Sequence, residues 1–414
     1  MKTYNKKYQR ISTLSVFLLI PLSGLAIDVY IPSFPEMQQE LHTESAGIQL
    51  TLTCFLISYG LTQLFTGSIV DSFGRYRLTL YSLLLFTLSS FAIAVIHNIY
   101  FIYSMRVIQG IATAFIVVGK RAFLVDIYSG KKLQHYTSLI TIVWSVAPIS
   151  APFIGGYLQK GFGWTANFYL LGAYSLVTLI IECFFSGETL SSPKKFKRKS
   201  ILSSYAHVLK STDFSIGLMI LGLCYSMVMV FGMTAPFLVE NRFHFTPVVT
   251  GYCALISGFG LMTGGILGKS ISHYAFFPKL IYGIIAAICV AVFMFVSSNY
   301  VSNIYTLMGF VFVMHMLSGF VYNVYFTYCL IRFPQHAGVA SGLTSGGSYL
   351  MTSIASYSII SLLTIDSQSG MAISYLLLSL AAIPLLLLAK KAIDKYLLGS
   401  IATPQEKIQE KAYH

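Results

Sequence analysis

Charged side chains are scarce in this sequence, because Asp, Glu, Lys and Arg make up 10% of its 414 residues. Soluble domains carry roughly 25% charged residues to cover their surface, so this composition excludes a water-soluble globular protein. Hydrophobic residues make up 56% of the chain, and the mean hydropathy is +0.72. We therefore expect lipid to cover most of the surface, and helices that satisfy their own backbone hydrogen bonds.

Cysteines and catalytic motifs are sparse as well. The six cysteines all fall inside apolar runs and no pair has metal-ligand spacing, so we expect small core residues and neither disulfides nor a metal site. The sequence also lacks an intramembrane cluster of His, Asp and Glu, a nucleophile beside a base, and a phosphate-binding glycine loop. These absences predict a protein that is not an enzyme and has no cofactor.

Long apolar runs, separated by charges or turn residues, predict an all-α polytopic membrane protein with twelve transmembrane helices. A helix needs about 20 apolar residues to cross the hydrocarbon core of a bilayer. Runs of that length occupy 11–34, 46–70, 77–97, 100–123, 134–158, 164–186, 213–238, 247–268, 277–297, 302–326, 337–362 and 370–390. The shortest separations follow the third and ninth runs, at His97-Asn98 and Ser297-Ser298-Asn299.

Lysine and arginine predict the orientation of these helices, because cytoplasmic loops are enriched in both. With the N-terminus inside, 24 of the 27 fall on the cytoplasmic side, Lys160 and Arg242 fall outside, and Arg106 lies within a run. Both termini are therefore predicted to be cytoplasmic. The formal net charge of +13 follows this topology, so a nucleic-acid partner is not predicted.

The pattern of runs divides the chain into two six-helix halves that resemble diverged repeats. Pro35 and Gly67 match Pro236 and Gly268 at one shared offset, as in the repeats of secondary transporters. The polybasic run at 193–199 predicts a solvated linker near anionic head groups. The expected parts are an N-terminal bundle over 1–186, a basic cytoplasmic linker over 187–212, a C-terminal bundle over 213–395 and a cytoplasmic tail over 396–414.

Three charged residues are expected to lie within the hydrocarbon, namely Asp28, Arg106 and Glu182. Charge within hydrocarbon costs about 2.5–3.5 kcal/mol on insertion scales and marks functional sites. Asp28 and Arg106 both lie roughly 9 Å below the outer edge, from the rise of the helix, and an ion pair would lower the cost of both. The pair is either a permanent salt bridge or a switch in which protonated Asp28 releases Arg106. Glu182 lies one turn from the cytoplasmic end and is expected to reach the interface in a structural role.

Two further segments combine turn residues with small residues. Between the second and third runs stand Gly67, Asp71, Gly74, Arg75 and Arg77. They form either a capped turn or a lock, in which Asp71 meets the positive N-terminus of the eleventh run. In the fifth run, prolines and small residues bend the helix and allow close packing. These residues are Ala147, Pro148, Ala151, Pro152, Gly155 and Gly156.

Both segments resemble motifs of the major facilitator superfamily. The stretch from Gly67 to Arg77 is similar to its signature between helices two and three, and the fifth run is similar to its antiporter motif. Arg106-Val-Ile-Gln109-Gly110 resembles its helix-four motif, which is tied to proton transfer. Asp28-Val-Tyr-Ile-Pro-Ser-Phe-Pro35 and Arg121-Ala…Asp126 resemble the bicyclomycin-resistance (Bcr/CflA) type of drug:proton antiporter.

The resemblance implies proton-coupled export of small, largely apolar compounds across a bacterial inner membrane. A monomer is expected to rock its two halves around a central cavity, with the proton gradient as the energy source. Residues on the spans that would line this cavity are Tyr30, Gln109, Tyr225, Met229, His315, Tyr322 and Asn323. His315 is either a titrating group or a hydrogen-bonded core residue. Alternatives are export of a metabolite such as a siderophore or amino acid, uptake of a nutrient, a membrane receptor or a membrane enzyme.

Overall fold

Helices dominate the computed structural model, which describes residues 4–190, 192 and 198–400. Some side chains within its helices lie outside the described part, namely those at 141, 142, 144, 145, 147, 198–201 and 395–400. Each predicted apolar run coincides with helix. After the first run, the long helices are α4 (Ser45–Phe73), α5 (Arg75–Val95), α6 (Ile99–Ile127), α7 (Gly130–Phe162), α8 (Thr165–Phe185), α10 (Thr212–Phe237), α11 (Pro247–Ser270), α12 (Phe276–Ser297), α13 (Ile304–Ile331), α14 (Ala337–Leu362) and α15 (Gln368–Ser400).

Ten helical segments among the described residues are long and apolar enough to cross a membrane. The other two predicted spans, α7 and α14, also exceed the length of about 20 residues that a crossing needs. α14 is less apolar because it is rich in glycine, serine and threonine, and several side chains of α7 lie outside the described part. The predicted all-α polytopic architecture is confirmed.

The first predicted span is broken into several pieces and is not one helix. α1 (Gln9–Leu19) and α2 (Leu22–Asp28) are separated at Pro21, and a 3₁₀ turn over Ile31–Ser33 leads into α3 (Phe34–Glu40). Proline has no backbone N–H and clashes with the preceding turn, so it interrupts a helix. A second interruption follows Asp28, where α2 ends before the 3₁₀ turn. The end of α2 leaves backbone carbonyls in the middle of a span, where tertiary contacts must satisfy them.

Asparagine caps explain how the shortest predicted turns can reverse the chain. Asn98 precedes α6, and its side-chain oxygen accepts a hydrogen bond from the Phe101 N–H at 3.0 Å. Asn303 precedes α13 and forms a capping box with Thr306. Both caps satisfy N–H groups of the first helical turn that have no partner within the helix. Similar turns thus stand at corresponding places in the two halves.

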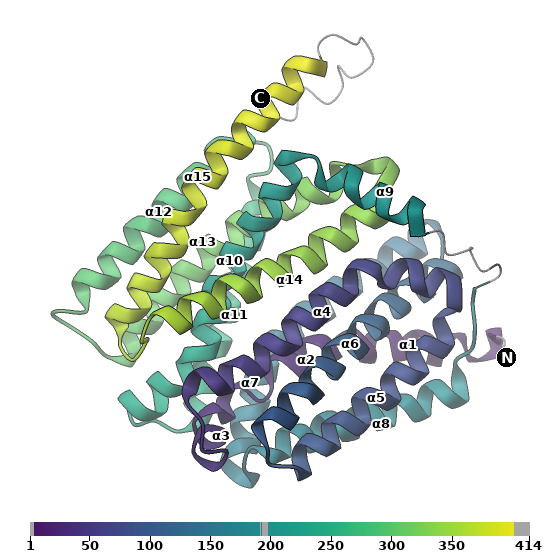
Figure 1. Cartoon of the computed structure of the whole chain (residues 1–414), viewed down its shortest axis with the longest axis horizontal. Coiled ribbons are helices and arrows are strands. Elements are labelled where there is room, and N and C mark those ends of the chain that lie inside the picture. Colours follow the sequence, from purple (N-terminus) through teal and green to yellow (C-terminus); the bar gives the residue numbers. More distant parts are fainter. Residues whose placement is uncertain (1–3, 191, 193–197, 401–414) are drawn as a thin grey trace. The chain divides into compact units, whose positions relative to one another are not determined.

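The chain packs as two units. The first unit is Met1–Arg198 with Val239–Leu255, and the second is Lys199–Leu238 with Ile256–His414. In the first unit, α6 packs against α4 and α5, and α5 packs against α8 (Figure 1). In the second unit, α10 packs against α13, α14 and α15, and α12 packs against α13 and α15. The first unit thus includes a segment, Val239–Leu255, that the sequence pattern assigns to the C-terminal bundle.

Glycines bring helices into close contact in both units. A Cβ atom on Gly110 of α6 would lie 2.5 Å from the carbonyl oxygen of Phe55 in α4. A Cβ atom on Gly319 of α13 would lie 2.3 Å from the carbonyl oxygen of Leu261 in α11. Small residues at such crossings let helices in lipid gain van der Waals contact. The second and fourth helices of each half are therefore packed through a glycine.

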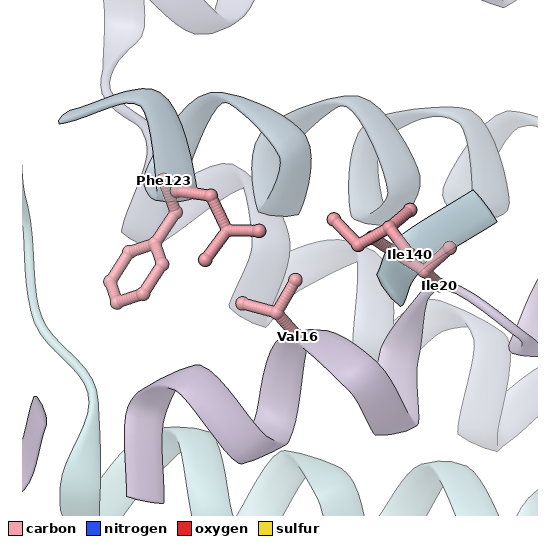
Figure 2. Close-up of a cluster of buried hydrophobic side chains, with 5 residues drawn as sticks. Val16, Ile20, Phe123 and Ile140 are labelled. Carbon is pink, nitrogen blue, oxygen red and sulfur yellow. The ribbon is translucent and has the colours of Figure 1, made fainter. Parts of the chain in front are cut away.

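A buried apolar cluster joins α1, α6 and α7 in the first unit. Val16 of α1 and Ile20, which directly follows α1, pack with Phe123 and Leu124 of α6 and with Ile140 of α7 (Figure 2). Tyr128, just before α7, and Tyr136, within α7, pack against this cluster.

The predicted linker is partly helical. α9 (Arg198–Leu209) occupies its second part, while residues 193–197 of the polybasic run lie outside the described residues. α15 continues into the predicted tail as far as Ser400.

Candidate functional site

Asp28 is buried at the break in the first span. It is the last residue of α2, and its neighbours Ala26 and Val29 are buried as well. Its carboxyl group forms no hydrogen bond or ion pair with another residue in the described part of the chain. A buried acid without a partner is costly when charged, and an ionisable residue inside a membrane span is a candidate functional site.

Arg106 is fully buried on α6 and is held by polar and aromatic groups. Its Nη2 atom donates to the Ala26 carbonyl at 2.9 Å, and its Nη1 atom donates to Gln109 Oε1 at 2.8 Å. The guanidinium carbon lies 4.6 Å from the ring centroid of Tyr30 and 4.5 Å from that of Phe55. A desolvated cation–π contact contributes about 2 kcal/mol, so this pocket accommodates a guanidinium without a carboxylate.

Two predicted cavity residues are part of this pocket. Gln109 is fully buried, and its amide nitrogen donates to Ser90 Oγ at 2.9 Å. Tyr30 is also fully buried, and its hydroxyl group lies 2.9 Å from Thr51 Oγ1. In this structure both side chains hold Arg106 in place.

The predicted pair of Asp28 and Arg106 is not in ionic contact within the described structure. Both residues do lie at the same break, as their matched depths suggest. Arg106 binds the Ala26 carbonyl because this group belongs to the last turn of α2, where carbonyls lack partners within the helix. An ion pair would require the guanidinium to move from Ala26 to Asp28.

Gly155 of α7, in the predicted antiporter-type segment, lies directly against the same break. A Cβ atom on Gly155 would lie 1.6 Å from the carbonyl oxygen of Val29, so a larger residue cannot be accommodated without a shift of the backbone. Asp28 thus lies between two carbonyl groups that contact other helices. The carbonyl of Ala26 binds α6, and that of Val29 contacts α7.

The rest of the antiporter-type segment is packed in a similar way. Pro148 and Pro152 lie inside α7, and Ala151 is fully buried. A Cβ atom on Gly156 would lie 2.6 Å from the carbonyl oxygen of Pro247 in the same unit. The side chain of Ala147 lies outside the described residues.

Arg75, at the start of α5, is the centre of the segment predicted as a lock. Its Nη2 atom lies 3.1 Å from Asp71 Oδ1, and its Nη1 atom donates to the Ala122 carbonyl at 3.2 Å and pairs with Asp126. These contacts join the ends of α4, α5 and α6. Gly74 has a φ of 96°, in the region that glycine favours over other residues.

Other members of the predicted lock have fewer constraints. A Cβ atom on Gly67 would meet no atom within 4 Å, and Arg77 is exposed. The expected contact of Asp71 with the start of α14 joins residues of different units, so it stays a prediction.

Glu188 is a functional candidate that local sequence patterns do not reveal. Its two carboxylate oxygens accept hydrogen bonds from the backbone N–H groups of Arg75 and Tyr76, each at 3.1 Å. A carboxylate at a helix N-terminus is favoured by the helix dipole. Glu188 lies in the predicted linker, more than a hundred residues from the helix that it caps.

A buried ion pair joins α6 to α8. Lys120 Nζ lies 2.5 Å from Glu182 Oε2, and Ser15 Oγ of α1 donates to Glu182 Oε1 at 2.5 Å. Glu182 was expected to reach the membrane interface, whereas the structure buries both its side chain and that of Lys120 inside the protein. The expected structural role of Glu182 stays a prediction. The spacing could have indicated the buried position of Lys120, since it follows Arg106 by about four helical turns, on the same buried face of α6.

Aromatic side chains gather on α10, α13 and α14 in the second unit. The ring of Tyr225 lies 5.9 Å from that of Tyr322 and 6.1 Å from that of Tyr349, measured between centroids. All three side chains are half-buried. Of the other predicted cavity residues in this unit, Met229 is buried and Asn323 is exposed.

His315 is fully buried and both of its ring nitrogens have hydroxyl partners. Nδ1 lies 2.7 Å from Ser257 Oγ, and Nε2 lies 3.0 Å from the Tyr375 hydroxyl group. This is the arrangement of a hydrogen-bonded core histidine.

The second unit also holds a buried acid. Asp213, at the start of α10, accepts a hydrogen bond from Arg332 Nε at 2.8 Å and another from the Tyr328 hydroxyl group. Buried acids paired with basic residues therefore occur in both halves. No group of three or more His, Cys, Asp or Glu among the described residues is arranged to hold a metal ion.

Comparison with known proteins places this architecture in a family. The family model of the Major Facilitator Superfamily matches residues 16–356. The MFS-type transporter YdgK of Bacillus subtilis is 26% identical over 346 residues, which are 82% of this chain and 86% of the relative. A bicyclomycin resistance protein homolog of Haemophilus influenzae is 35% identical over 179 residues, which are 43% of this chain and 44% of the relative.

A solved structure has the same fold. The crystal structure of the nucleoside transporter NupG superposes with a TM-score of 0.70 at 13% identity, and the match covers 93% of this chain and 99% of the other. The match of the family model to most of the chain confirms a transporter rather than an enzyme. The chain therefore belongs to the Major Facilitator Superfamily.

Proposed function

We propose that this protein exports small, largely apolar compounds in exchange for protons, with Asp28 as the proton carrier. The observation that carries this proposal is the position of Asp28, buried and without a partner among the described residues, between two carbonyls that contact other helices. Ala26 binds Arg106 of α6, and Val29 contacts Gly155 of α7. A proton on Asp28 therefore acts on two helix contacts at once.

The coupling follows from the cost of an unpaired charge. In the described arrangement Arg106 is bound to a backbone carbonyl, which suits a neutral Asp28. When Asp28 releases its proton, the negative charge attracts the guanidinium of Arg106 away from Ala26. The end of α2 then loses the contact of Ala26 with Arg106 and gains a contact of Asp28 with Arg106. This change biases the helices of the first half between two arrangements.

Aromatic side chains support the proposed class of substrate. Tyr225, Tyr322 and Tyr349 are half-buried and close to one another, and tyrosine offers both an apolar face and a polar hydroxyl group. The bicyclomycin resistance name of the Haemophilus influenzae relative also favours export of a drug-like compound. That match spans less than half of this chain, so the substrate class rests mainly on the residues.

The distribution of Lys and Arg supports the location and orientation. We propose a bacterial inner membrane with both termini in the cytoplasm, because 24 of the 27 basic residues then lie on that side. Under this orientation, protons enter from the outside and the compound leaves the cell.

Everted membrane vesicles with an acidic interior test the proposal. Adding an exported compound should release protons from the vesicles, at a rate that saturates with its concentration. Vesicles from cells that lack the protein serve as the control. A broad panel of apolar compounds without any proton release would overturn the drug-export proposal and favour a metabolite or nutrient as the substrate.

A further inference from the structure

A basic cavity of about 660 Å³ opens at one end of the first unit. Five basic side chains line it, and no acidic side chain does. Three of them precede or begin α1 and two lie in the first turn of α7. The lining residues are Lys6, Lys7, Gln9, Arg10, Tyr128, Lys131, Lys132, His135 and Tyr136. The enrichment of basic residues in cytoplasmic segments accounts for the side of the membrane on which these residues lie, but not for their gathering around one cavity.

The start of α7 is electrostatically unfavourable as it stands. Lys131 and Lys132 occupy its first turn, where the helix dipole favours negative groups, and this turn contains no acidic residue. The N-cap residue Ser129 makes no side-chain cap hydrogen bond. Within the described residues, none of the five basic side chains forms an ion pair with a carboxylate. An external anion at this place would relieve both the repulsion among the lysines and the unfavourable dipole interaction.

The surroundings of the cavity match the boundary between lipid head groups and acyl chains. The ring centroids of Tyr128 and Tyr136 lie 4.4 Å apart, and both rings pack on the apolar cluster of Val16, Ile20 and Phe123. Tyrosine is enriched at membrane interfaces. Further along α1, Ile11 and Leu14 are 38% and 58% exposed, so an apolar surface continues from the basic residues into the membrane.

We propose that this cavity binds the phosphate head group of an anionic phospholipid of the cytoplasmic leaflet. The five basic side chains that line the cavity supply the charge for the phosphate, the two tyrosines complete the lining, and Ile11 and Leu14 offer an apolar surface to an acyl chain. A soluble phosphate would use the charges but not this apolar surface. The proposal does not depend on the exported compound or on Asp28. It does depend on the proposed orientation, in which this end of the unit is cytoplasmic.

Full-length protein in lipid nanodiscs tests the proposal. The discs contain phosphatidylcholine alone or with a titrated fraction of phosphatidylglycerol, and native mass spectrometry counts the lipids that remain bound. The test variant K131Q/K132Q removes two charges from the cavity. The control variant K390Q/K391Q removes two exposed charges from α15, which does not line it.

The expected result is selective loss in the test variant. Each basic residue near an anionic surface contributes about fivefold in affinity, so K131Q/K132Q should bind phosphatidylglycerol about thirty-fold more weakly. The control variant should bind it as the wild type does. Thermal unfolding gives a second test, because the difference in stability between K131Q/K132Q and the wild type should depend on the lipid. K131Q/K132Q should be at least as stable as the wild type in phosphatidylcholine, and less stable than the wild type when phosphatidylglycerol is present.

Two outcomes would overturn the proposal. Equal loss of phosphatidylglycerol in the test and control variants would show that general surface charge, and not this cavity, attracts the lipid. A second outcome concerns inorganic phosphate added to discs of pure phosphatidylcholine. If millimolar phosphate stabilises the wild type as strongly as phosphatidylglycerol does, the cavity is a site for a soluble anion.

Discussion

Gly155 of α7 is packed directly on the backbone carbonyl of Val29, which follows Asp28 in the broken first span. A Cβ atom at position 155 would lie 1.6 Å from that oxygen. The proposed proton carrier is therefore placed at a point where a neighbouring helix touches the backbone itself. A movement of this part of the first span is transmitted to α7 by direct contact.

Gly155→Ala should damage both stability and transport. The added methyl group overpacks the contact with Val29, and overpacking of this kind typically costs about 1–3 kcal/mol. Gly161→Ala is the matched control on the same helix, because a Cβ atom there would meet no atom within 4 Å. Thermal unfolding of the purified variants measures the difference. Equal melting temperatures for the two variants would contradict the close contact of α7 with the first span.

The buried pair of Lys120 and Glu182 predicts non-additive effects of substitution. Removing one partner leaves an unpaired buried charge, which costs about 3–5 kcal/mol, so Lys120→Met and Glu182→Gln should each destabilise the protein strongly. The double variant K120M/E182Q should be more stable than Lys120→Met alone, because no charge is left behind. Unfolding temperatures of the three variants check this order. Additive losses would show that the two side chains do not interact.

Arg75 and Arg77 should differ sharply although both belong to the predicted lock. Arg75 joins the ends of α4, α5 and α6 through Asp71, Ala122 and Asp126, while Arg77 is exposed. Arg75→Ala should slow substrate turnover at unchanged substrate affinity, and Arg77→Ala should have a small effect. Transport rates and binding constants separate the two effects. Similar turnover in both variants would reduce Arg75 to a turn residue.

His315 is expected to contribute stability and not proton coupling. His315→Phe leaves the Ser257 and Tyr375 hydroxyl groups without their partner, and an unsatisfied buried polar group costs about 1–3 kcal/mol. The variant should therefore unfold at a lower temperature and keep the pH profile of wild-type transport. A shifted pH profile for His315→Phe would instead make His315 a candidate proton carrier.

Most of the helical architecture could be predicted from the sequence, because runs of about 20 apolar residues have few alternatives in lipid. The two interruptions of the first span, at Pro21 and after Asp28, were missed because apolar residues continue through both. The partner of Arg106 could not be predicted for the same reason. The Ala26 carbonyl is available to Arg106 because α2 ends at Asp28.

Tertiary contacts account for the other differences. Glu188 caps α5 from a distant part of the chain, and neither segment contains a local signal for this pairing. Lys120 stands near the end of the fourth predicted run, and its helical spacing from Arg106 indicates a buried position. Charge counting describes topology on average, and it cannot identify a single lysine that is neutralised by Glu182.

The central claim is that Asp28 carries the proton, and Asp28→Asn in proteoliposomes tests it most directly. The substitution keeps the shape of the side chain and removes its titration. We predict that Asp28→Asn still exchanges substrate across the membrane when no gradient is present, and that a pH gradient no longer drives accumulation of the substrate. Full gradient-driven accumulation by Asp28→Asn would contradict this claim and move the proton to another group, with Glu182 and His315 as the next candidates.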